Sequence, residues 1–282
     1  MKNKKRIIIL ILCILVAIIF CLVAFFIKNK ASSNNESDNL SIEELIIEKK
    51  YKKTSENNEL LNIFNSLKKY VYNTNRKGTN SFSKIELFSI AGYNVKEKDI
   101  TNTKDEGDYT YGYINKELLD KQIADVFGKG KFIIGLDSEN SKKTLNSGVF
   151  ENAGDKFKNA LLMEETKKQY YFRFYANEGT SACPKLKNIP IKLIEVRQID
   201  NNILLVAKSV QTRVLETEDN QCSVDVINYT IKDPLDTFKV DMGEASYTVD
   251  IDKYIENAMD VYVLLKKENN GKYVFVESKI GE

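Results

Sequence analysis

The chain has 282 residues, with 42 Lys and Arg, 40 Asp and Glu, and neither histidine nor tryptophan. The absence of histidine excludes Ser-His-Asp and Cys-His catalysis and the HExxH zinc motif within this chain. Six of the 42 cations fall in residues 1–30, which hold no anion, so the remainder has 36 cations against 40 anions. Such a mildly acidic, mixed surface predicts no nucleic-acid partner.

The N-terminal segment predicts a membrane anchor. Four cationic side chains in residues 1–6 precede Ile7–Ile27, an unbroken apolar run that is followed by Lys28 and Lys30. The run has about the length that an α-helix needs to cross a bilayer. Because more cations precede the run than follow it, we predict a cytoplasmic N-terminus, a single-pass anchor within 1–30 and an extracytoplasmic remainder.

A cleaved signal peptide is the competing interpretation of this segment. Its apolar region is normally about 7–15 residues long and ends at small residues. A cut after Ala31 would place Asn29 at the −3 position, which is a poor match. A lipoprotein cut needs a small residue before its cysteine, whereas Leu precedes Cys13 and Phe precedes Cys21. The pattern therefore favours a retained anchor.

The segment after the anchor combines a polar linker with helical patterns. Residues 31–40 are almost entirely polar and predict a short linker. Ser41 and Glu44 have the spacing of a capping box at a helix start. Apolar residues at three- and four-residue steps predict a longer helix over Glu56–Tyr72.

Two further helices are expected before the middle of the chain. Ser83–Ala91 starts with another capping-box pattern, although its Ile and Phe content also allows a strand. Asn115 can cap a helix over Lys116–Phe127, and Gly128 supplies a residue that commonly ends helices. Between these helices, Tyr109–Tyr113 alternates as a strand would.

The second half of the chain is predicted to be mainly β. A polar loop at Asp137–Gly148, a short helix at Asp250–Ala258 and hairpin turns at Asp200–Asn202 and Asn269–Gly271 interrupt the β-prone segments. These segments are Lys131–Ile134, Tyr170–Tyr175, Ile191–Ile199, Ile203–Leu215, Ser223–Ile231, Val261–Leu265 and Lys272–Glu277.

The order of these elements predicts an α+β fold. Helices come first and a mostly antiparallel sheet follows, after the N-terminal transmembrane helix. We expect one extracytoplasmic domain over 41–282, or two domains divided near 137–148. A chain of this length can bury a substantial core.

Two of the four cysteines lie outside the apolar run. Cys183 and Cys222 are a disulfide candidate if this part of the chain is in an oxidising compartment. The alternative is two free buried thiols. No metal site is expected, because two thiolates without histidine lack the usual partners.

Several short motifs resemble catalytic or ligand-binding fragments. Ser66–Lys69 and Ser81–Lys84 match Ser-x-x-Lys, but the partner Lys-Thr-Gly motif is absent and lysine is abundant enough for chance matches. Gly128–Gly130 continues into neither a dinucleotide motif nor a P-loop. The acidic pairs at Asp137–Glu139 and Asp250–Asp252 lack the remainder of a calcium loop. We expect no cofactor.

Aromatic residues gather in two places. Tyr109, Tyr111 and Tyr113 would share one face of a strand and could line a surface for a peptide or glycan. The second group is Tyr170, Tyr171, Phe172, Phe174 and Tyr175. The structural alternative is that aromatic residues simply favour half-buried strands.

These features together predict a non-catalytic binding or interaction module of the bacterial cell envelope. Its expected partners are the membrane and a membrane-proximal protein or envelope component. One alternative is a cell-surface hydrolase that uses two carboxylates, whose identities the sequence does not specify. Another is a substrate-binding subunit, which would need a deep pocket.

Overall fold

The structure is a computed structural model that describes residues 41–47, 51–128, 144–145, 150–157, 159–175, 183–217, 219–228, 233–244 and 246–281. The chain divides into two compact units, Met1–Ile47 and Glu48–Glu282. The predicted anchor, Ile7–Ile27, and the linker lie outside the described residues. Within the described ranges, no helix is both long enough and apolar enough to cross a membrane.

The described part of the first unit is the short helix α2 (Ile42–Ile47). The Ser41 hydroxyl accepts a hydrogen bond from the Glu44 backbone N–H, and the Glu44 carboxylate accepts one from the Ser41 N–H at 2.8 Å. This reciprocal pair confirms the predicted capping box and satisfies two amide groups that the first helical turn leaves without partners.

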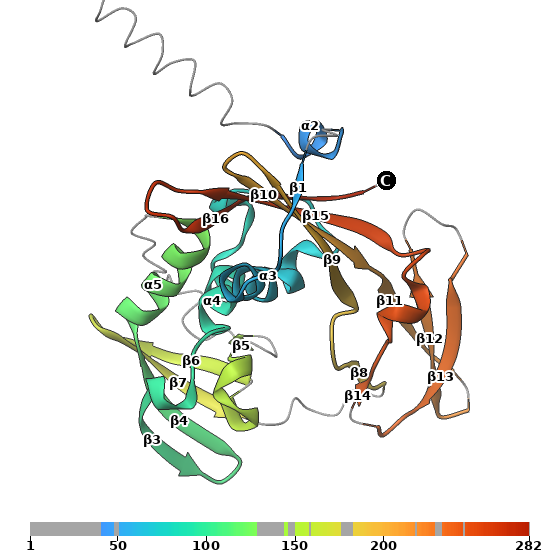
Figure 1. Cartoon of the computed structure of the whole chain (residues 1–282). Helices are drawn as coiled ribbons and strands as arrows, with labels where there is room; N and C mark the ends of the chain where they lie inside the picture. Colours follow the sequence, from blue (N-terminus) through green and yellow to red (C-terminus); the bar gives the residue numbers. More distant parts are fainter. Residues whose placement is uncertain are drawn as a thin grey trace, which may run out of the picture. The chain divides into compact units, whose positions relative to one another are not determined.

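In the second unit, three helices lie between two antiparallel sheets (Figure 1). The helices are α3 (Asn58–Val71), α4 (Lys84–Gly92) and α5 (Lys116–Phe127). One hydrophobic core combines buried residues of all three helices with the facing residues of both sheets. Its members come from both sides of residues 137–148. The predicted α+β order, helices first and mostly antiparallel sheets after, is confirmed.

Local signals explain where the three helices begin and end. The Asn57 side chain accepts from the Leu60 N–H at 2.9 Å, and Asn115 does the same for Glu117. Ser83 and Glu86 form the predicted capping box of α4, so the strand alternative for this segment is wrong. α5 ends where Gly128 has a φ of 90°, a value that favours glycine.

The six-stranded sheet has the order β1-β9-β10-β15-β16-β2, and all its neighbouring strands are antiparallel. Tight turns join β9 to β10 and β15 to β16, which confirms both predicted hairpins. The strands are β1 (Lys52–Lys53), β2 (Arg76–Lys77), β9 (Ile191–Ile199), β10 (Asn202–Ser209), β15 (Met259–Lys267) and β16 (Tyr273–Ile280).

The five-stranded sheet has the order β3-β4-β7-β6-β5 and is also antiparallel. Its strands are β3 (Ile100–Glu106), β4 (Tyr109–Asn115), β5 (Thr144–Leu145), β6 (Asn159–Glu165) and β7 (Gln169–Tyr175). The predicted strand Lys131–Ile134 lies outside the described residues. Within the predicted loop Asp137–Gly148, the structure describes only β5.

A smaller β region follows, with three antiparallel strands and one parallel pair. The strands are β11 (Gln211–Glu216), β12 (Gln221–Ile227) and β13 (Asp236–Asp241), and the pair is β8 (Lys185–Leu186) with β14 (Ser246–Tyr247). A disulfide joins Cys183 to Cys222. Fully buried Cys222 belongs to a second, smaller core with Val224, Val240 and Tyr247.

Two predicted elements are wrong in detail. The strand expected over Ile203–Leu215 breaks at Val210, whose N–H donates to the Pro190 carbonyl at 3.1 Å instead of continuing the ladder. This break moves the chain from the six-stranded to the three-stranded sheet. The helix expected over Asp250–Ala258 is a 3₁₀ turn at Ile251–Tyr254. Among the described residues, 3₁₀ turns also occur at Thr79–Ser81, Glu97–Asp99, Glu151–Ala153 and Asp155–Phe157.

Candidate binding surface on the five-stranded sheet

The two central strands of the five-stranded sheet, β4 and β7, send alternate side chains to opposite faces. Ile114, Phe172 and Phe174 point inward and are fully buried in the main core. The outward positions form a set that we call the tyrosine–arginine row. Its members are Tyr109, Tyr111, Tyr113, Tyr171, Arg173 and Tyr175, each exposed or partly exposed.

The strand register places the outward residues of the two strands opposite one another. Tyr113 pairs with Tyr171, Tyr111 with Arg173, and Tyr109 with Tyr175. Tyr171 stacks on Tyr113 with ring centroids 4.6 Å apart and on Tyr111 with centroids 6.0 Å apart. Tyr171 of β7 therefore contacts two tyrosines of β4, instead of forming a single cross-strand pair.

Arginine extends this stack toward the other end of the row. The guanidinium carbon of Arg173 lies 4.6 Å from the centroid of the Tyr109 ring, which is the geometry of a cation–π contact. Tyr109 is 40% exposed and is one of four exposed large hydrophobic residues in the described part of the chain. This end of the row therefore combines a cation with an accessible aromatic ring.

Each tyrosine of the row carries a hydroxyl group that can donate or accept a hydrogen bond. Burial raises the pKa of Tyr171 above its ordinary value of about 10, and the neighbouring phenols of Tyr113 and Tyr111 add to the shift. The row offers phenolic hydroxyl groups and one guanidinium to the solvent. The adjacent strand contributes Lys104 and Glu106, which form an ion pair with each other.

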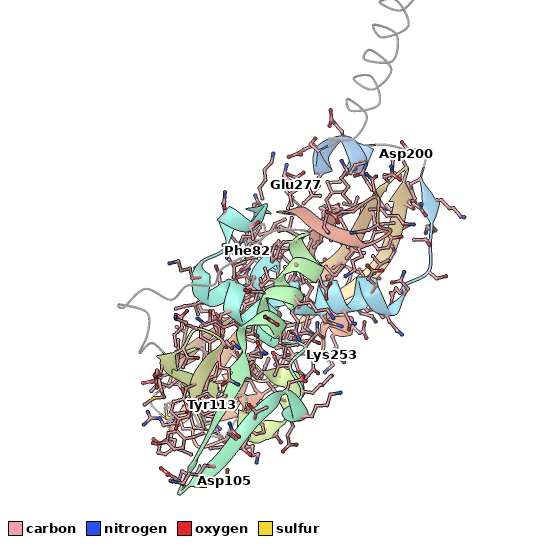
Figure 2. All side chains as sticks on the ribbon, turned by 90° about the vertical axis from the view of Figure 1, so that its left-hand side faces the viewer. Phe82, Asp105, Tyr113, Asp200, Lys253 and Glu277 are labelled. Carbon is pink, nitrogen blue, oxygen red and sulfur yellow. A yellow bond between two sulfur atoms is a disulfide. The ribbon has the colours of Figure 1, made fainter. Side chains whose placement is uncertain are left out.

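A glycine allows the neighbouring strand to pack against β4. A Cβ atom at Gly112 would lie 2.6 Å from Cγ2 of Ile100 in β3, which is too close for a nonbonded contact. Thr110 on the same face donates from its hydroxyl to the Asp105 carboxylate at 2.6 Å. These contacts hold the β3–β4 hairpin, with Asp105 near its end (Figure 2).

The sequence predicts only part of the tyrosine–arginine row. Tyr109, Tyr111 and Tyr113 do lie together on one face, away from the core. The second aromatic group divides, because Tyr170, Phe172 and Phe174 enter the core while Tyr171 and Tyr175 face outward. The period-two alternation of Tyr170–Tyr175 was the signal that could have identified Tyr171, Arg173 and Tyr175 as one face.

The two Ser-x-x-Lys matches are structural. Ser66 is 3% exposed and its hydroxyl donates to the Ile63 carbonyl at 2.8 Å, so a substrate cannot reach it. The Ser81 hydroxyl donates to the Gly78 carbonyl at 2.8 Å and accepts from the Lys77 N–H at 3.0 Å. Both hydroxyl groups stabilise local backbone turns.

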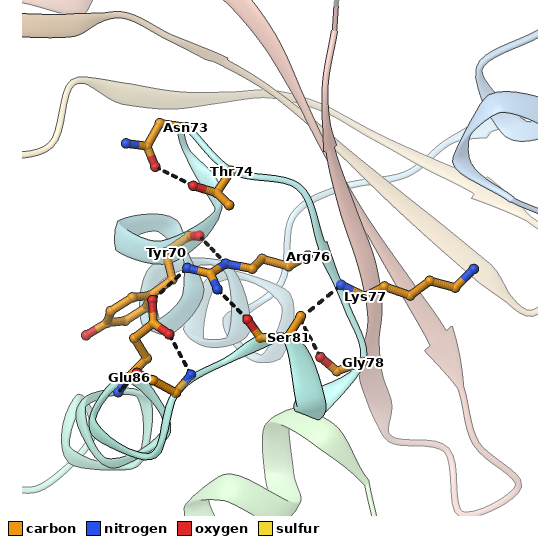
Figure 3. A network of polar contacts seen from close by, with 9 residues as sticks. Tyr70, Asn73, Thr74, Arg76, Lys77, Gly78, Ser81 and Glu86 are labelled. Atoms are coloured by element: carbon orange, nitrogen blue, oxygen red, sulfur yellow. Dashed lines mark hydrogen bonds and ion pairs between the residues drawn. The ribbon is translucent and has the colours of Figure 1, made fainter.

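Arg76 organises the turn that contains Ser81 (Figure 3). Its guanidinium donates to the Tyr70 carbonyl at 3.2 Å, to the Ser81 carbonyl, and to the Glu86 carboxylate at 2.6 Å. It also lies 5.1 Å from the centroid of the Phe82 ring. Because these contacts occupy the guanidinium, Arg76 links α3 to α4 and is unsuited to binding a ligand.

The remaining sequence motifs also have local roles where they are described. Asp250 caps the 3₁₀ turn through the Asp252 N–H at 3.2 Å, and Asp252 pairs with Lys192. Gly128 ends α5, while Gly130 and Asp137–Glu139 lie outside the described residues. In the part of the chain that is described, no group of three or more metal-ligating side chains comes together.

Comparison with known proteins finds no matching family model, no matching curated protein and no matching solved structure. The geometry of the tyrosine–arginine row and the residues around it therefore have to support any proposal for function.

Proposed function

We propose that this chain is a membrane-anchored, extracytoplasmic binding module of the bacterial cell envelope, without catalytic activity, and that the tyrosine–arginine row is its binding surface. The apolar run Ile7–Ile27 and its flanking charges support the anchor. The disulfide between Cys183 and Cys222 is in keeping with an oxidising compartment. The partner would be a membrane-proximal protein or envelope component, because the linker over 31–40 is short.

The observation that carries the proposal is the exposure of five tyrosines and one arginine on the face of a sheet whose other face is in the core. Tyrosine and arginine are enriched in binding interfaces, since both offer large contact areas together with hydrogen-bond donors. Tyrosine also loses little conformational entropy on binding. Stacking between Tyr171 and its neighbours pre-organises the row before a partner arrives.

Photo-crosslinking in intact cells tests this proposal on the full chain. A benzoylphenylalanine at Tyr111 places the reactive group within the row. The same group at Leu215, which is 50% exposed on the three-stranded sheet, provides the matched control. We expect a specific crosslinked partner from position 111 and none in common with position 215. Identical products from both positions, or none from position 111, would refute the assignment of the surface.

The anchor and its orientation have their own test. Protease added to whole cells should digest the region after residue 40, and the membrane-bound chain should retain residues 1–30. If the protease spares this region, or if the mature chain lacks its apolar segment, the proposed localisation is wrong.

The alternative function is a cell-surface hydrolase with two carboxylates. Such an enzyme needs a carboxyl group that can hold a proton. On α5, burial raises the pKa of Asp120. Lys116, which partly opposes this shift, forms an ion pair with Glu165. A carboxyl group with a raised pKa is one of the two acids that a glycosidase needs. Release of cell-wall fragments by the wild-type chain, abolished by D120N, would favour this alternative.

A further inference from the structure

Arg173 differs from the other arginines that the structure describes. Arg76, Arg197 and Arg213 each pair with a carboxylate, at 2.6, 2.9 and 2.6 Å respectively. Among the described residues, no carboxylate pairs with Arg173, and its buried Nε atom has no hydrogen-bond partner. A partly buried guanidinium without an acceptor is unfavourable, because desolvation is not compensated by hydrogen bonds.

On β6, the exposed Glu164 lies opposite Tyr171, but Arg173 itself has no charged residue directly opposite it in the sheet. Its direct cross-strand neighbours are Tyr111 on β4 and Leu161 on β6. Its contact with the Tyr109 ring holds the guanidinium in place, but a ring face leaves the planar N–H groups free to donate to an acceptor. The nearby Glu106 is already paired with Lys104.

The residues around this guanidinium have the composition of a protein interface. Beside the tyrosines, β6 contributes the partly exposed Leu161 and also Met163, which is 39% exposed. Tyr, Met and Arg are the side chains enriched at the centres of protein–protein interfaces. A carboxylate is the group in a protein that matches a guanidinium with two parallel hydrogen bonds.

We infer that the partner is a protein, and that it places an Asp or Glu side chain on Arg173 while its apolar residues contact Tyr109 and Met163. This inference rests on the proposed function, because it identifies the chemistry of the partner at the same surface. Exchanging Arg173 for an uncharged residue removes charge-assisted hydrogen bonds worth about 1.5–3 kcal/mol, which corresponds to roughly 10- to 100-fold in affinity. R173Q should therefore lower the yield of the Tyr111 photo-crosslink at least about tenfold.

A zero-length coupling experiment tests the carboxylate directly. R173K places an amine where the partner's carboxylate is expected, and a membrane-impermeant carbodiimide joins the two as an amide in intact cells. R213K is the matched control, because Asp225 is the known partner of Arg213 and should give an intrachain link. In the purified full chain in detergent, we expect the 213–225 link and no link at position 173.

In cells, mass spectrometry should find position 173 joined to an Asp or Glu of another protein. A link to an acid of the same chain, to a second copy, or to a glycan carboxylate would overturn the inference. The absence of any link at 173, while photo-crosslinking from 111 still captures a partner, would also overturn it and would leave the proposed function standing. Failure of both experiments would refute both.

Discussion

Removing the disulfide should destabilise the smaller β region more than the main core. Cys183 and Cys222 are 39 positions apart in the sequence, and in the chain-entropy model a loop of this length contributes about 4 kcal/mol. The smaller core has only four buried members, and two of the β elements around it, β8 and β14, have only two residues each. A loss of this size is therefore a substantial fraction of what this core contributes by burial, since a fully buried aliphatic or aromatic side chain contributes roughly 1.5–3 kcal/mol.

The stability of the main core should depend much less on the disulfide. It contains neither cysteine and is formed by the three helices and the two larger sheets. In C183A/C222A, we expect the free energy of opening to fall by about 3–4 kcal/mol for β12. Amide exchange there would accelerate by roughly two to three powers of ten. The strands β10 and β15 should change less than about tenfold.

Hydrogen–deuterium exchange of the full chain in detergent, followed by mass spectrometry, measures these regions separately. Wild-type chain treated with a reductant should match the double variant, which controls for the substitutions themselves. Unchanged protection of β12 would show that the bridge contributes little. An equal loss in β12, β10 and β15 would show that the two cores unfold together, and would refute their independence.

Three other predictions concern the candidate surface and the three-stranded sheet. G112A should lower the free energy of unfolding by about 1–3 kcal/mol, because its new methyl group would overlap Ile100. Thermal unfolding of G112A/I100A should show a loss smaller than the sum of the losses in the two single variants. Y171A should lose two ring stacks and with them about 1–3 kcal/mol of unfolding free energy, whereas Y171F should stay within about 0.5 kcal/mol of wild type. Equal losses in the two variants would contradict the stacking role of Tyr171. Hydrogen bonds, first from Arg213 and then from Thr237, lower the pKa of Asp225 in the folded chain. The ionised Asp225 therefore stabilises the fold above about pH 4, which is the ordinary pKa of Asp. This contribution is lost as the pH falls through the lower pKa of the folded state. Between pH 5 and 2, the unfolding free energy of D225N should accordingly fall less than that of wild type. Parallel plots of unfolding free energy against pH would refute this.

Strands with weak local signals are not predicted from the sequence, and the reason is physical. In β3, only Ile100 is buried, so the strand shows no apolar alternation. β1 and β2 have two residues each and exist because they pair with the edges of the six-stranded sheet. Such strands depend on an edge supplied by distant segments, which no local pattern records.

Local chemistry along the chain was enough to determine the helices and the tight hairpins. Capping residues such as Asn57, Ser83 and Asn115 act within a few positions of themselves, and the same is true of turn residues. The candidate surface was decided by the tertiary structure. Tyr170 and Tyr171 are chemically identical neighbours, and only the packing of α4 and α5 on one face of the sheet determines which side chain is buried and which is left for a partner.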